Sequence, residues 1–172
     1  MKTIVLGVGN PILSDDGVGV HVAQQIKQRI NDPNVTVEEA MTGGMNLLDL
    51  ILGYDKAIII DAVKTSDGRN GEVHRYHLSD ISTIHSCNPH DVSLVEAITL
   101  AKKLGEEHIP HEIIIIGISM TEMPCEFGEH LSETIAAAVP NAVEVALAEI
   151  TNKKTISRKR KQDYMDTYIK KN

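Results

Sequence analysis

Aliphatic runs and alternating segments along the chain predict five strands. Residues 3–6, 57–62 and 112–118 are apolar runs, typical of strands buried on both faces, and the run at 57–62 closes with an aspartate. Residues 35–40 and 72–77 instead alternate apolar with polar residues, as half-exposed strands do. The last of these is expected at an edge of the sheet, which would make the sheet mixed.

Amphipathic helices are predicted between these strands. The clearest begins near Asp16, because Val18, Val22 and Ile26 recur every four residues and form one apolar stripe. Pro140 lies inside the last helix and is expected to kink it or divide it in two. Strands that alternate with helices predict an α/β three-layer sandwich, with a mixed, mostly parallel sheet and helices on both faces. The other predicted helices cover residues 45–52, 92–104 and 130–150.

Composition and charge narrow the class of protein. Hydrophobic residues make up 42% of the 172 residues, which fits a single globular domain, expected over residues 1–151. Residues 1–152 carry 9 Lys and Arg against 22 Asp and Glu, which argues against general nucleic-acid binding. Residues 153–172 carry 8 Lys and Arg against 2 Asp. Residues 152–172 are therefore expected to form a basic, solvated tail, which could also meet an acidic partner.

Targeting signals are missing from the sequence. Two cysteines, Cys87 and Cys125, are too few for a disulfide scaffold and fit a reducing compartment. The segment 1–11 lacks the apolar core and the cleavage site of a signal peptide. No apolar stretch reaches the length of about 18 residues that spans a bilayer. We therefore expect a cytoplasmic protein that has no contact with a membrane.

The Gly-rich segment 7–19, GVGNPILSDDGVG, is the first candidate for chemistry. A dinucleotide-binding loop would need a third glycine where Ile12 stands, and Asp15 and Asp16 would repel a phosphate at the helix start. These acids could be plain helix caps, although two in succession exceed what a cap requires. Ligands of open α/β sheets bind beyond the carboxyl ends of the strands, which places this loop and Asp61 at one functional edge. Asp61 alone could equally be a turn residue.

The segment 85–91, HSCNPHD, holds two histidines and a cysteine. Such a set could bind zinc, although the spacing matches no standard zinc motif, and His85 and Cys87 could be ordinary loop residues. A nucleophilic pair of Cys87 with a histidine is conceivable, without an oxyanion-hole motif to support it. His90 directly precedes a predicted helix, and Asp91 could cap that helix or orient the imidazole of His90.

Four sequence blocks occur in a fixed order along the chain: IVLGVGNPILSDDGVG at 4–19, TGG at 42–44, IIIDA at 58–62 and NPHDVSL at 88–94. Together they resemble the nickel–iron hydrogenase maturation endopeptidases. The resemblance covers residues 1–150 and departs from the family pattern at Met41 and Met120, where the family usually has Gly and Pro. It implies a mixed sheet between helices, in agreement with the elements predicted above.

The resemblance also implies an activity and a site. It implies removal of the C-terminal extension of a hydrogenase large-subunit precursor after nickel insertion. Asp16, Asp61 and His90 are then the catalytic and metal-binding residues, and they recognise nickel supplied by the substrate, with no tightly bound cofactor in the free enzyme. Carboxylate and imidazole ligands suit such an ion. The loop-shaping or substrate-binding residues are Gly7, Gly9, Asn10, Thr42 and Gly43, and the residues that support the ligands from behind are Asp15 and Asp91.

Two other classes of protein remain open at this point. A non-catalytic nickel chaperone, or a chaperone of the hydrogenase subunit, would use the same ligands as the protease. A phosphorylase-type hydrolase on a similar fold is disfavoured, because the Gly-Asn loop carries no basic residue that would bind phosphate. We expect the protein to be a monomer and to bind no nucleic acid.

Overall fold

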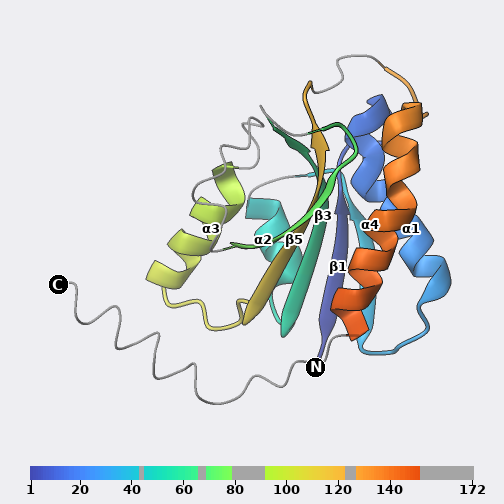
Figure 1. The fold of residues 1–172 in the computed structure, drawn as a ribbon. Helices are drawn as coiled ribbons and strands as arrows, with labels where there is room; N and C mark the ends of the chain where they lie inside the picture. The colour runs from blue at the N-terminus through green and yellow to red at the C-terminus, as the bar shows by residue number, and fades with distance from the viewer. Residues whose placement is uncertain (43–44, 66–68, 79–91, 123–126, 152–172) are drawn as a thin grey trace.

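The computed structural model describes residues 1–42, 45–65, 69–78, 92–122 and 127–151 (Figure 1). Its elements follow the predicted order of strands and helices. In chain order they are β1 (Thr3–Val8), the 3-10 turn η1 (Ser14–Gly17), α1 (Val18–Arg29), β2 (Val35–Ala40), α2 (Met45–Ile51), β3 (Lys56–Lys64), β4 (Val73–His77), α3 (Val92–Lys103), β5 (Glu112–Met120) and α4 (Glu133–Thr151).

Five strands form one mixed sheet in the order β2-β1-β3-β5-β4. The neighbours β2, β1, β3 and β5 pair in parallel, and β4 pairs with β5 in the antiparallel direction. The alternating segment at 72–77 is therefore an antiparallel edge strand, as its pattern predicts. The mixed, mostly parallel sheet of an α/β fold is confirmed.

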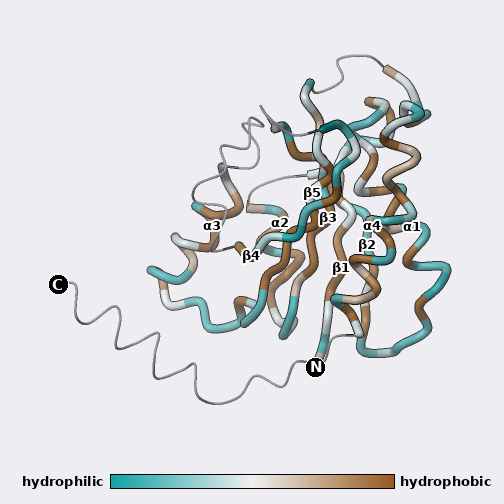
Figure 2. Tube along the Cα trace, in the orientation of Figure 1, coloured by the Kyte–Doolittle hydropathy of each residue, from teal (hydrophilic) through white to brown (hydrophobic). Residues whose placement is uncertain are grey.

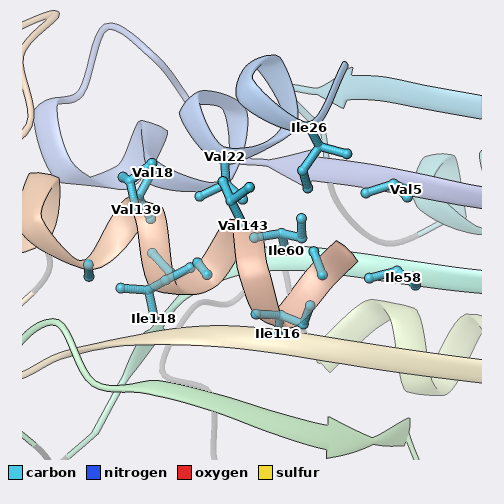
Figure 3. Packing of buried hydrophobic residues seen from close by; sticks show 14 of the residues in the cluster. Val5, Val18, Val22, Ile26, Ile58, Ile60, Ile116, Ile118, Val139 and Val143 are labelled. Carbon is cyan, nitrogen blue, oxygen red and sulfur yellow. The ribbon is translucent and has the colours of Figure 1, made fainter. Parts of the chain in front are cut away.

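Helices cover both faces of the sheet (Figure 1). α1 and α4 pack on one face and α2 and α3 on the other, and each pair shares a buried apolar cluster with the strands. Figure 2 shows the apolar stretches running along the central strands. In Figure 3, Val22 of α1 and Val143 of α4 lie next to Ile60 and Ile116 of the sheet. The aliphatic composition is thus accounted for by two cores around one sheet.

The helix α4 differs from its prediction in two ways. It runs unbroken from Glu133 to Thr151 with Pro140 inside it, so of the expected kink or division, the division does not occur. Pro140 is on the exposed side, where water can satisfy the carbonyl that loses its amide partner. α4 is also long and apolar enough, by length and composition, to cross a membrane, contrary to the prediction. Its buried residues, such as Val139 and Val143, pack on the sheet and explain this apolar character.

A buried ion network holds α4 to the amino edge of the sheet. Lys56 begins β3 and is 2% exposed; its Nζ lies 3.0 Å from Oε2 of Glu149 and 3.1 Å from Oε2 of Glu112. It also donates to the main-chain oxygen of Glu149 at 3.0 Å, in the last turn of α4, where helix carbonyls lack partners. Arg75 of β4 forms an ion pair with Glu149. Burial disfavours the charge of Glu149, but the hydrogen bonds and charges of Arg75 and Lys56 outweigh it and lower its pKa.

Candidate functional site

Asp61 lies in the part of strand β3 that extends beyond the end of its neighbour β1. Ile60 is the last residue of β3 paired with β1, whereas β3 stays paired with β5 as far as Lys64. Asp61 therefore lies inside the strand, and the prediction that it ends the strand is wrong. Pairing with β5 keeps the chain extended after β1 has turned away. Ile60 and Ala62 point into the core under α1 and α4, so the side chain of Asp61 points to the opposite face.

The face toward which Asp61 points is the face of α2 and α3. The side chain is half-buried, and its Oδ1 accepts a hydrogen bond from the backbone N–H of Ala62 at 2.8 Å. α3 begins at Val92, at the same upper edge of Figure 1 where α1 begins. Residues 85–91, which include His90, Asp91, His85 and Cys87, lie outside the described residues.

The Gly-Asn loop is folded tightly back on Asp16. Gly9 has a φ of +135°, and a Cβ at this position would stand 1.9 Å from the main-chain oxygen of Asp16. Oδ2 of Asp16 accepts a hydrogen bond from the backbone N–H of Asn10 at 2.8 Å. Among the described residues, no hydrogen bond reaches its other oxygen, Oδ1. Asp16 therefore fixes the loop through its Oδ2.

Glycines also set the helix α1 directly against the sheet. Gly7 is part of β1, and a Cβ there would stand 2.2 Å from the main-chain oxygen of Gly19. A Cβ on Gly19 would stand 2.2 Å from the oxygen of Val8 and 2.3 Å from that of Ile60. Gly7 thus serves close packing of helix on strand, rather than the loop turn that the sequence suggests. This packing brings η1, which carries Asp16, into contact with β3, which carries Asp61.

A second segment clamps the loop from the side of β5. Leu13 and Gly128 form an isolated parallel bridge, in which Gly128 donates to the oxygen of Ile12 at 3.0 Å and accepts from the backbone of Ser14 at 2.7 Å. The hydroxyl of Ser14 donates to the main-chain oxygen of His130 at 2.9 Å. These contacts were not predicted from the sequence, since they join positions more than a hundred residues apart.

Asp15 belongs to this clamp. Its Oδ1 accepts a hydrogen bond from the backbone N–H of Ser132 at 2.6 Å, directly before the first residue of α4. A carboxylate is favoured at this end of a helix by the free N–H groups and the helix dipole. Asp15 therefore anchors the η1 turn, which also carries Asp16, to the start of α4.

The third predicted loop lies after β2. Oγ1 of Thr42 accepts a hydrogen bond from Nδ2 of Asn46 at 2.8 Å, which ties the loop to the first turn of α2. Gly43 lies outside the described residues. Within the described ranges, which omit His90, no three His, Cys, Asp or Glu side chains stand close enough together to hold a metal ion. The ligand set of Asp16, Asp61 and His90 remains a prediction.

Comparison with known proteins settles the family. The family model HycI, described as hydrogenase maturation protease, matches residues 20–149. The chain belongs to this family. Hydrogenase maturation proteases of this kind are endopeptidases, so the chain is a peptide hydrolase that acts in hydrogenase maturation.

Individual members of the family agree with this assignment. The hydrogenase 2 maturation protease of Escherichia coli is 27% identical to the chain over 153 residues, which are 87% of this chain and 91% of that protein. The solved structure of the hydrogenase maturating endopeptidase HybD from E. coli has a TM-score of 0.75 and 26% identity, and covers 90% of this chain and 94% of its own. The NiFe hydrogenase maturation protease HybD from Thermococcus kodakarensis has a TM-score of 0.66 and 25% identity, with coverage of 86% and 97%.

Proposed function

We propose that this protease removes the C-terminal extension of the large-subunit precursor of a nickel–iron hydrogenase, after nickel has been inserted. The name of the T. kodakarensis relative refers to this class of hydrogenase. The observation that carries the proposal is the contact at the carboxyl edge of the sheet between η1, with Asp16, and β3, with Asp61. Ligands of α/β folds bind at such an edge.

Nickel in the substrate is the recognition element in this proposal. Oδ1 of Asp16 and the carboxylate of Asp61 supply oxygen ligands, and His90 supplies a nitrogen ligand. This mixed set suits a borderline divalent ion. Three protein ligands leave coordination positions open for groups of the precursor, and they form a weaker cage than a four-ligand structural site. The free enzyme therefore binds no metal tightly, and the ion arrives with the substrate.

Binding through the nickel places the scissile peptide at the same edge. The ion could polarise the carbonyl of the scissile peptide or lower the pKa of a bound water, and the two carboxylates would hold the ion in place. Positioning alone also accelerates hydrolysis, because it removes the entropic cost of bringing the groups together. In this proposal the enzyme works in the cytoplasm as a monomer, and it requires neither a membrane nor a nucleic acid.

A cleavage assay with matched variants tests the proposal. The purified protein is incubated with a nickel-loaded large-subunit precursor, and the intact mass of the precursor is followed. Wild type should shorten it, whereas Asp16→Asn and Asp61→Asn should lower the rate by roughly 100-fold or more. Asp49→Asn, on the exposed side of α2, is the control and should cut like wild type. A wild-type protein that binds the precursor and leaves its mass unchanged would favour the chaperone alternative.

A further inference from the structure

Two large apolar side chains lie exposed on the clamp that holds the Gly-Asn loop. Phe127 is 84% exposed and Ile12 is 50% exposed. Phe127 is the one phenylalanine of the chain, which has no tryptophan, and yet it contributes nothing to either core cluster. Single exposed apolar residues are ordinary, but two that lie together on a fixed backbone are not.

The backbone register places the two side chains next to each other. Leu13 and Gly128 form a parallel bridge, so Ile12 and Phe127, which precede them, are neighbours across it. Paired backbones lie about 5 Å apart, so the exposed side chains of Ile12 and Phe127 start from adjacent points of the clamp. Two loops distant in sequence thus each contribute one exposed apolar side chain to the same small region of the surface.

The apolar pair is mounted rigidly. Two backbone hydrogen bonds, of 3.0 Å and 2.7 Å, connect Gly128 to Ile12 and Ser14. Ser14 has a φ of +49°, which is rare for a residue other than glycine, and its hydroxyl bond to His130 helps to hold it there. A backbone that is already fixed loses little entropy when a partner binds, which is a property of recognition surfaces.

The position of the pair relative to Asp16 identifies what it would contact. Ile12 precedes Asp16 by four positions, so their Cα atoms are at most about 15 Å apart, and the turn of Asp16 N–H onto the oxygen of Leu13 shortens this. A stable protein–protein interface covers about 800 Å² of each partner, equivalent to a disc of about 16 Å radius. An interface of this size centred on Asp16 is therefore wide enough to reach Ile12 and, across the bridge, Phe127.

We propose that Ile12 and Phe127 form a docking surface for a bulky apolar side chain of the hydrogenase precursor, beside the metal-recognition site. This inference rests on the proposed function. Aromatic residues near the centre of an interface contribute most to affinity, so Phe127 is the stronger contact of the two. The pair makes no bond to the reacting atoms. It contributes to substrate affinity rather than to the chemical step.

Steady-state processing of the nickel-loaded precursor tests this inference. Phe127→Ala should raise KM about tenfold with kcat within about twofold of wild type, and Ile12→Ala should raise KM by about threefold. Phe127→Leu should restore most of the affinity. Leu104→Ala is the matched control, because Leu104 is 78% exposed and lies in the connection to the start of β5, at the opposite edge of the sheet. Melting temperatures of all four variants should equal that of wild type.

The outcomes separate the inference from the function on which it rests. If wild type cuts the precursor and both alanine variants keep its KM, the docking surface is wrong and the protease activity stands. A fall in kcat at unchanged KM would also contradict it. If wild type leaves the precursor intact, the proposed function fails. Calorimetric titration with the same precursor then still decides the docking surface, because equal dissociation constants for wild type and Phe127→Ala would overturn it.

Discussion

At the scale of single residues, the loop that carries Asp16 depends on glycine because backbone occupies the space of a side chain. Gly9 faces the main-chain oxygen of Asp16 at a distance that no Cβ tolerates. Gly53 also has a positive φ, +83°, but nothing lies within 4 Å of a Cβ there. A side chain at Gly53 would therefore meet backbone strain without the steric exclusion that it would meet at Gly9.

Replacement of these two glycines gives a direct prediction. Gly53→Ala should cost about 1–2 kcal/mol of stability from the positive φ alone and leave processing unchanged. Gly9→Ala should carry at least this strain and also displace Asp16, so processing should fall by more than about tenfold. The measurement is precursor cleavage by both variants at equal folded concentration. Equal activity of the two would show that the loop geometry does not matter for the reaction.

The residue scale also shows where prediction from sequence stops. Asp15 and Asp16 are adjacent, and the sequence predicts that two acids in succession exceed what a cap requires. The partner of Asp15 is the backbone of Ser132, and that of Asp16 is the backbone of Asn10. The second contact is local, whereas the first joins positions 117 apart. A contact of that separation is decided by the packing of α4, which no local pattern contains.

At the scale of elements, the periodicity of apolar residues predicts whether a segment is a helix or a strand. The pairing of strands in the folded chain then sets where each strand ends. Apolar runs locate β1, β3 and β5, but β3 begins at Lys56 and continues to Lys64, past Asp61. The sequence pattern places Lys56 in a loop, because charged side chains are rarely buried. It is buried here because Glu112 and Glu149 neutralise it, and these residues come from two other elements.

The unbroken helix α4 yields a stability prediction. Pro140 lacks an N–H and lies on the exposed face, so Pro140→Ala restores a helix hydrogen bond without disturbing the core. The free energy of unfolding should rise by roughly 1–3 kcal/mol, as measured by urea titration. Asn141→Ala, at the next exposed position, controls for helix propensity and should gain less than about 1 kcal/mol. A loss of stability in Pro140→Ala would mean that the core has adapted to the proline.

The ion network at the other edge predicts how stability depends on pH. The folded state lowers the pKa of Glu149 below its ordinary value of 4.5, so its contribution is complete above that value and is lost as the pH falls through the folded pKa. Unfolding free energy measured between about pH 3 and pH 7 should therefore fall more steeply toward acid in wild type than in Glu149→Gln. Glu144→Gln removes an exposed ion pair with Arg29 and should follow wild type. Identical acid slopes for all three would exclude this role.

At the scale of the whole molecule, the two edges of the sheet have separate tasks. The amino edge carries the ion network of buried Lys56 and Glu149 with the exposed Arg75, which fixes the end of α4. The carboxyl edge carries the glycine-packed loop, the clamp and Asp61, all held by backbone contacts. The family blocks predict part of this carboxyl edge, because the block at 4–19 runs from β1 into the Gly-Asn loop, whereas the block at 58–62 lies inside β3. The order of the strands and the clamp become visible only in the folded chain.

The central claim is that nickel in the substrate is what the enzyme recognises. Its most direct test takes one large-subunit precursor in two forms, nickel-loaded and metal-free, and measures the intact mass of each after incubation with the protein. The account predicts that only the nickel-loaded form is shortened, and that His90→Ala, which removes the nitrogen ligand, shortens neither form. Cleavage of both forms at the same rate would contradict the account and would assign recognition to the polypeptide alone.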